Sequence, residues 1–228
     1  MGFYRGPNIV TDGLVLALDA ANPTSYVSGS TTWRDLSGNG FNSTLSNIIF
    51  NSNGWFDSGS ATYSVNRFNS GSPQQGTYRI VMKFPPLDTT NSTILFNDGG
   101  SSNNLVYLYR NSFWTANTYG WLIFYTKTDT TIDSLLAQPT YIPNVWYDIV
   151  FTFDTSGAYR VYRNAELLSS LTATSFSSWN RTGNNTPVLS ANSGAGTGSL
   201  SSFQWYNRAL TLTEIQQNYN AIRGRFGL

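Results

Sequence analysis

The chain contains no cysteine and no histidine. Without cysteine it has no disulfide, no thiol nucleophile and no cysteine metal ligand. Without histidine it lacks the commonest acid–base group and the commonest metal ligand. A Ser-His-Asp or Cys-His catalytic arrangement is therefore impossible within this chain, and so is a zinc site that needs histidine. Any catalysis would rest on carboxylates, tyrosine, lysine or a hard metal ion.

Charge is also scarce. Charged residues make up 11% of the 228 residues, the formal net charge is +1, and the basic residues are scattered. No stripe of Lys and Arg is present to neutralise a phosphate backbone, so we expect no nucleic-acid partner. No run of about 18 apolar residues occurs, so we expect no membrane insertion. The opening segment MGFYRGPNIVTDG lacks the apolar stretch of a secretory signal peptide.

Aromatic residues, by contrast, are abundant at 15% of the chain, and Gly, Ser, Thr and Asn fill much of the remainder. Aromatic side chains pack well on pleated sheets, and the small polar residues are typical of turns. No composition break marks a linker, and all-β domains of this length commonly form a single unit. We therefore expect one all-β domain over residues 1–228.

Alternation of side-chain character indicates the strands. Tyr78, Ile80 and Met82 alternate with Arg79 and Lys83. A period of two places alternate residues on opposite faces of a strand. The same period recurs over residues 105–110, 121–125, 147–154 and 202–206.

Only the C-terminal segment predicts a helix. Thr211 and Glu214 have the spacing of a capping box, in which the first residue caps the helix and the second reaches back to it. Gly224 is the expected stop. We expect this helix to cover one end or edge of a sandwich with a single apolar face, made of Leu212, Ile215, Tyr219 and Ile222.

Three short segments predict turns. Residues 35–40 separate Trp33 from Phe41, and residues 154–157 separate two strand-like runs. The third is Asn164-Ala165, where a two-residue hairpin favours Asn-Gly. Because alanine tolerates a positive φ poorly, we expect a different type of turn there.

Segments at both ends and in the middle carry a family likeness: GLVLALDAANPTSY, TTWRDLSGNGFNSTL, VWYDIVFTFDTSGAYRVYRNAEL and FQWYNRALTLTEIQQNYNAIRGRFG. They resemble laminin-G-like, concanavalin A-like jelly-roll domains of the kind found in tailed-phage structural proteins and bacterial surface proteins. Ala165 and Asp148 depart from the pattern, standing where glycine and histidine are frequent. The resemblance implies a two-sheet antiparallel jelly-roll sandwich with a short C-terminal helix, each sheet having about six or seven strands.

The same fold occurs in lectins, glycosidases and adhesion modules, so the fold alone does not indicate whether the protein hydrolyses sugars. The number and spacing of its acidic residues do. A glycosidase needs two carboxyl groups across the scissile bond. The chain has only two glutamates: Glu214 belongs to the capping box, and Glu166 stands alone beside a hairpin. Asp148 and Asp154 are six residues apart in the sequence, which is about 20 Å along a strand and too far for either glycosidase geometry. We therefore expect no enzymatic activity.

A calcium ion at a sandwich rim is the one metal that the resemblance suggests. Asp35 with Asn39, or Asp98 with Asn97, offers the oxygen ligands that Ca²⁺ prefers. Asp and Asn also occupy turns for purely local hydrogen bonding. We predict no metal ligands and no cofactor, with calcium as the open alternative.

Sugar binding needs flat aromatic faces beside short polar groups. Two segments with this composition supply the predicted ligand-binding residues, which are Trp114, Asn117 and Tyr119 in one and Trp179, Asn180 and Asn184 in the other. Burial between the sheets, or packing within a loop, is the alternative for their aromatic rings. We expect Trp33 and Trp55 to serve packing.

These observations favour a non-catalytic module on a virion surface, as a capsid decoration, fibre or tail component. Its partner would be a cell-surface glycan or another virion subunit, and it would be a homo-oligomer or assembled on the particle. Phe3, Tyr4 and Arg5 precede the family-like segments and are candidates for docking onto a carrier. The alternative is an extracellular carbohydrate-binding lectin domain, secreted by a bacterium or held on its surface. A glycoside hydrolase ranks below both.

Overall fold

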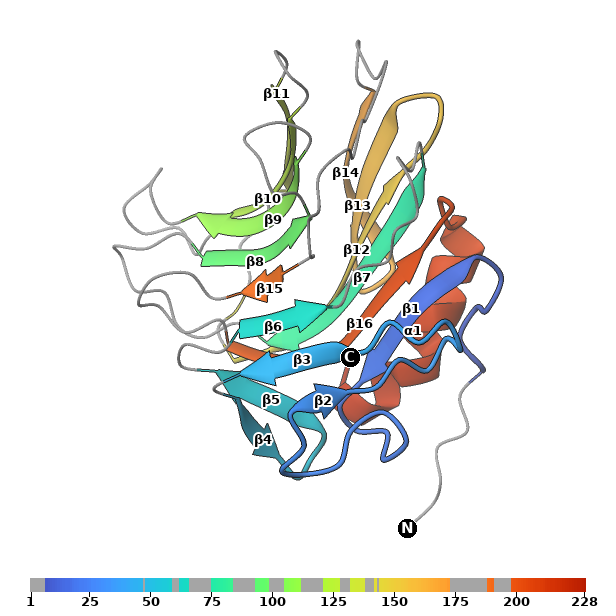
Figure 1. Cartoon of the computed structure of the whole chain (residues 1–228). Coiled ribbons are helices and arrows are strands. Elements are labelled where there is room, and N and C mark those ends of the chain that lie inside the picture. Colours follow the sequence, from blue (N-terminus) through green and yellow to red (C-terminus); the bar gives the residue numbers. More distant parts are fainter. Residues whose placement is uncertain are drawn as a thin grey trace.

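The computed structural model describes residues 7–46, 48–58, 62–65, 75–83, 93–98, 105–111, 121–127, 132–137, 142, 144–172, 188–190 and 198–228. They form two antiparallel sheets and one C-terminal helix (Figure 1). The predicted all-β, two-sheet architecture with a short C-terminal helix is thereby confirmed. No helix in the described ranges has the length and apolar character needed to cross a membrane.

The first sheet, called here the helix-side sheet, contains β1 Leu14–Asp19, β4 Ile49–Asn51, β5 Trp55–Ser58, β7 Gly76–Lys83, β12 Trp146–Phe153, β13 Ala158–Arg163, β14 Glu166–Thr172 and β16 Gly198–Tyr206. Its order is β14-β13-β12-β7-β16-β5-β4, and β1 also pairs with β16. Strands β5 and β1 share one edge of β16, since β5 pairs with residues 198–200 and β1 with residues 202–206.

The second sheet contains β2 Thr32–Trp33, β3 Ser43–Ser46, β6 Thr62–Val65, β8 Thr93–Asp98, β9 Leu105–Asn111, β10 Trp121–Lys127, β11 Ile132–Ala137 and β15 Val188–Ser190. Its order is β11-β10-β9-β8-β15-β6-β3-β2. Each sheet therefore has eight described strands, more than the six or seven that the resemblance implied.

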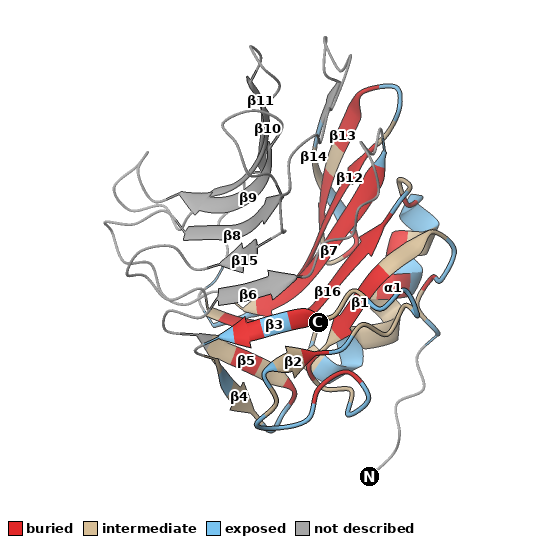
Figure 2. Ribbon diagram, viewed as in Figure 1, coloured by how far each residue is buried: buried red, intermediate tan, exposed pale blue. Residues whose placement is uncertain are grey.

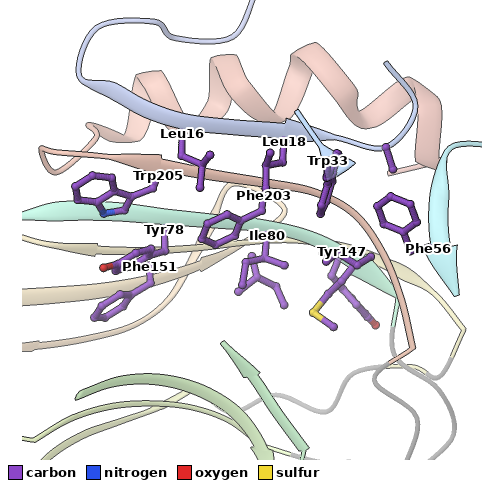
Figure 3. Packing of buried hydrophobic residues seen from close by; sticks show 14 of the residues in the cluster. Leu16, Leu18, Trp33, Phe56, Tyr78, Ile80, Tyr147, Phe151, Phe203 and Trp205 are labelled. Carbon is purple, nitrogen blue, oxygen red and sulfur yellow. The ribbon is translucent and has the colours of Figure 1, made fainter. Parts of the chain in front are cut away.

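The inner face of the helix-side sheet carries the main core. Tyr78, Ile80 and Met82 of β7 face inward, as the period of two predicts, and Trp33 of β2 packs edge-on against Phe56 of β5 at 4.9 Å between ring centroids. Figure 3 shows Trp33, Phe56, Tyr78 and Ile80 in one layer with labelled residues from β1, β12 and β16. Each buried aromatic or aliphatic side chain contributes about 1.5–3 kcal/mol relative to an exposed one.

The outer face of the same sheet is covered by helix α1, which spans Leu212–Phe226 (Figures 1 and 2). A second apolar cluster lies beneath the helix and joins it to the strands, made of Val10, Val150, Tyr162, Ala165, Tyr206, Leu210 and Ile215. The expectation that the helix covers an end or edge of the sandwich was wrong. The reason is that the outer residues of β7, β12 and β16 are themselves buried, so that this face needs a cover.

The two ends of the helix differ in how well the sequence predicts them. Thr211 caps the N-terminus and Glu214 completes the capping box, as predicted. The helix does not stop at Gly224: it continues to Phe226, and Gly227 ends it in the left-handed conformation with φ 69°. A glycine inside the last turn is tolerated where the next glycine supplies the left-handed cap.

The predicted apolar helix face was wrong at two positions. Leu212, in the first turn, is 47% exposed, while Asn218 is fully buried. Asn218 occupies a core position because its amide is hydrogen-bonded on both sides. Its Oδ1 accepts from the Val10 backbone nitrogen at 2.7 Å, and its Nδ2 donates to the Tyr206 hydroxyl at 3.1 Å. Burial in this setting raises the pKa of Tyr206.

A buried ion pair lies beneath the helix next to this asparagine. Arg79 donates from Nε and Nη2 to the two carboxylate oxygens of Asp148 at 2.8 and 2.9 Å, and both side chains are at most 1% exposed. Arg79 also donates to Gln204 Oε1 and to the backbone oxygen of Asn218, each at 2.9 Å. The arginine therefore links strands β7, β12 and β16 to the helix backbone.

The hairpin between β13 and β14 corrects a second expectation. Asn164 and Ala165 both have positive φ, at 52° and 63°, which is the two-residue turn that alanine was expected to avoid. Tertiary contacts hold the turn: Asn164 exchanges backbone and side-chain hydrogen bonds with the Asp148 backbone, and the Ala165 methyl is buried in the cluster beneath the helix. The turn at residues 154–157 forms as predicted, with Gly157 at φ 77°.

Candidate functional site

The sequence-predicted sugar-binding residues lie outside the described residues. Trp114, Asn117 and Tyr119 fall between β9 and β10, and Trp179, Asn180 and Asn184 fall between β14 and β15. The suggested docking residues Phe3, Tyr4 and Arg5 also lie outside them.

The candidate calcium loop has a structural role. Asp35 Oδ1 accepts hydrogen bonds from the backbone nitrogens of Ala17 and Ser37 at 3.0 and 2.8 Å. Its Oδ2 accepts from the Ser37 hydroxyl at 2.7 Å and from the Phe41 nitrogen at 3.1 Å. The Asn39 amide donates to the Val15 carbonyl at 2.9 Å. Both residues thus fasten the turn to β1.

The second suggested pair, Asp98 and Asn97, lies in β8 of the second sheet. Among the described residues, no group of three or more acidic side chains is placed to hold a metal ion.

Three of the four acids considered for hydrolysis are held by interactions of their own. Asp148 is fully buried in its ion pair with Arg79, and Asp154 accepts hydrogen bonds from its own turn. Glu214 receives two bonds from Arg208, at 2.9 and 2.6 Å, which together with the capping box hold the pKa of Glu214 at about 2. Glu166 lies exposed at the start of β14.

A partly exposed aromatic cluster stands out on the outer face of the helix-side sheet, beyond the C-terminal end of α1. We call it the Trp55–Trp146 patch, and it consists of Trp55, Lys83, Trp146 and Phe226. The two indole rings meet edge-on at 5.3 Å between centroids, and Phe226 packs against Trp146 at 4.7 Å. The patch thus joins β5, β7 and β12 to the last turn of the helix.

Strand register explains why these residues gather on one face. Trp146 lies opposite Lys83, Lys83 opposite Ser199, and Ser199 opposite Asp57, across four neighbouring strands. The next row, made of Tyr147, Met82, Leu200 and Phe56, points into the core. Because side chains alternate, the first row must point outward. Trp55, two residues before Asp57, joins the same face.

Lys83 lies between the two tryptophans. Its Nζ is 5.2 Å from the Trp55 ring centroid and 5.4 Å from the Trp146 ring centroid. Cation–π contacts of this kind contribute about 0.5–2 kcal/mol each, depending on how dry the site is. Both contacts favour this position of the ammonium, since its movement away from the rings would break them.

Short polar groups border the patch. The Ser199 hydroxyl donates to Asp57 Oδ1 at 2.5 Å, and the Asn51 amide donates to Asp57 Oδ2 at 3.4 Å. On the helix side, Arg225 donates to Asp19 Oδ2 at 2.9 Å. Hydrogen-bonding side chains thus stand beside aromatic rings, all of them on strands or on the end of a helix.

Sequence reasoning assigned Trp33 and Trp55 to packing and did not single out Trp146. The assignment is confirmed for Trp33, which is fully buried. Trp55 is only partly buried and lies on the outer face. The period of two around Tyr147 was the available signal, because it places Trp146 on the face opposite the core.

Comparison with known proteins gives a family and a fold. Residues 57–216 match the family described as the Concanavalin A-like lectin/glucanases superfamily. No curated protein is similar enough in sequence to count as a match. The fold is similar to that of the botulinum neurotoxin serotype D binding domain, with TM-score 0.71 and 16% identity over 92% of this chain and 52% of that chain.

Two further structures are similar to the same degree. The binding domain of Paraclostridial Mosquitocidal Protein 1 has TM-score 0.68 and 17% identity, covering 92% of this chain and 52% of that one. The serotype D ligand binding domain in complex with N-acetylneuraminic acid has TM-score 0.71 and 16% identity, covering 92% and 51%. The chain thus spans about half the length of these domains. At such identities the likeness shows the fold alone, and it confirms the predicted jelly-roll sandwich.

Proposed function

Since the chain belongs to the concanavalin A-like lectin/glucanase superfamily, we propose that it is a non-catalytic module that binds glycans. The observation that carries this proposal is the Trp55–Trp146 patch. There, partly exposed indole rings lie beside the hydrogen-bonding side chains of Asn51, Asp57 and Lys83.

The chemistry of the patch suits a sugar ring. The apolar C–H face of a pyranose lies against an indole, while its hydroxyls bond to carboxylate, amide and ammonium groups at the border. The side chains stand on paired strands, so little conformational entropy is lost when the ligand binds. A single patch of this size would bind weakly, and an oligomer would gain affinity by avidity.

The carboxylates support the non-catalytic part of the proposal. Glycosidases place two carboxyl groups about 5–9.5 Å apart around a cleft. Of the acids on or near the patch, Asp57 is held by Ser199 and Asn51, and Asp19 is held by Arg225. Each of these two carboxylates is thus engaged in hydrogen bonds with partners of its own. We expect no release of reducing sugar from any polysaccharide that the protein binds.

The similar structures support a role in recognition. They are binding domains of toxins, and one of them was solved with a sialic acid. Because this chain spans about half of that domain, the sugar complex does not locate a ligand on the shared part. The proposal therefore rests on the patch, with the neighbours as support for the class of function.

More specifically, we propose that the protein is displayed on the surface of a phage particle, as a decoration, fibre or tail component that contacts host glycans. It rests on the resemblance of the N- and C-terminal segments to phage structural proteins. The alternative is a bacterial extracellular lectin domain. Mass spectrometry of purified particles decides between them: detection in stoichiometric amount supports display, and absence rejects it.

A glycan array probed with multimerised protein tests the binding function. We expect Trp146→Ala to lower glycan binding at least tenfold with the fold retained, as judged by circular dichroism. The control is Leu212→Ala, which trims an exposed apolar residue at the opposite end of the helix and should leave binding unchanged. Equal glycan binding by Trp146→Ala and the wild-type protein would show that the Trp55–Trp146 patch is not the glycan-binding site.

A further inference from the structure

Basic residues in the described part of the chain differ in what their charge contacts. Arg79, Arg160, Arg208 and Arg225 each form an ion pair with an aspartate or glutamate. Lys83 is partly buried, and its partners among the described residues are the two tryptophan rings, just as Arg163 and Arg223 each lie over a tyrosine ring. A partly buried ammonium has given up part of its hydration, and no ion pair within the described residues compensates the charge of Lys83.

The described acids on or beside the patch, Asp19 and Asp57, are bonded to other residues. Asp19 is neutralised by Arg225 at 2.9 Å. Asp57 lies two strands from Lys83 in the same cross-strand row, about 10 Å away at normal strand spacing. Both of its carboxylate oxygens accept hydrogen bonds, from Ser199 and Asn51. The lysine charge is therefore available to a carboxylate that a ligand supplies.

We infer that the Trp55–Trp146 patch takes a sugar bearing a carboxylate, whose charge pairs with the Lys83 ammonium while its ring lies against an indole. This inference rests on the proposed function, since it names the ligand class of the same patch. One carboxylate suits the site better than a dense polyanion, because Asp57 faces the patch and repels additional negative charge.

The carboxylate belongs to a uronic acid or to a sialic acid, and calorimetry with matched sugars distinguishes the two sources. An oligogalacturonate is compared with its methyl ester, which keeps the shape of the sugar and removes the charge. Sialyllactose is compared with lactose. We expect the charged member of one pair to bind at least tenfold more tightly than its neutral counterpart, with the difference shrinking at high salt.

Variants then assign the effect to Lys83. Lys83→Met keeps an unbranched side chain over the rings and should lower affinity for the charged sugar about tenfold, while affinity for the neutral sugar is unchanged. Lys83→Arg should retain most of the preference. The control is Arg160→Met on β13, opposite Thr152 near the far end of β12. It removes a charge of the same sign that is paired with Asp154, and it should have no effect on binding.

The outcomes separate the inference from the function on which it rests. Equal affinity of the wild-type protein for charged and neutral sugars overturns the inference and leaves glycan binding standing. A charge preference that survives in Lys83→Met overturns it as well. Binding of no sugar in any arm or on the array overturns both. If Lys83→Met fails to fold, the wild-type comparison and Lys83→Arg still decide.

Discussion

Replacing Asp148 with asparagine would test how the helix is attached to the sandwich. The change keeps the shape of the side chain and removes the charge that faces Arg79. Arg79 is 1% exposed, and its other two acceptors, Gln204 and the Asn218 carbonyl, are neutral. The variant therefore leaves a buried guanidinium without a counter-ion.

The expected cost follows from the burial of the pair. Removing one partner of a buried ion pair costs about 3–5 kcal/mol, because the remaining charge keeps its desolvation penalty. For a domain of 150–250 residues, each kcal/mol lowers Tm by about 2–4 °C, so the expected loss is roughly 10 °C. Urea unfolding followed by tryptophan fluorescence measures the free energy, and hydrogen exchange of the helix amides shows whether the helix loosens first.

A double variant provides the decisive comparison. Arg79→Met with Asp148→Val removes both charges and fills the space with apolar groups, so it should be more stable than either single variant. The reasoning is refuted if Asp148→Asn costs less than about 1 kcal/mol. It is refuted equally if the double variant is as unstable as the two single variants added together.

Three other predictions concern local features. The hydrogen bonds from Arg208 lower the folded-state pKa of Glu214 from 4.5 to about 2, so the stabilisation by this carboxylate is complete above pH 4.5 and is lost as pH falls toward 2. The urea midpoints of the wild-type protein and of Glu214→Gln should therefore converge over that pH window. A constant difference between the two midpoints would contradict the role given to Glu214. Ala165→Gly should change stability by less than about 1 kcal/mol, because glycine relieves the positive φ and this offsets the lost burial of the methyl group. Ala165→Val should cost about 2 kcal/mol or more. Equal stability of these two variants would argue against a strained turn. Asp35→Ala should cost about 2–4 kcal/mol of stability through loss of the hydrogen bonds to its carboxylate. Neither calcium nor a chelator should shift the Tm of the wild-type protein. A calcium-dependent Tm that Asp35→Ala abolishes would instead show that the turn at residues 35–40 is a metal site.

Much of the site lay beyond sequence reasoning. The aromatic residues chosen from composition, such as Trp114 and Trp179, stay predictions, because they fall outside the described residues. Trp55 and Trp146 are 91 positions apart and meet only because β5 and β12 belong to one sheet, with β7 and β16 between them. Such a contact depends on strand order, which local alternation does not specify.

The sequence by itself determined the fold class, the capping of the helix by Thr211 and the exclusion of histidine and cysteine chemistry. These features depend on alternation, short-range spacing and composition, which act within a few residues. The tertiary structure alone decided that the helix covers the outer sheet face, that Arg79 and Asp148 form a buried pair, and that Ala165 accepts a positive φ. Each of these depends on strands distant in sequence, whose packing overrides local preference and places charges where water is excluded.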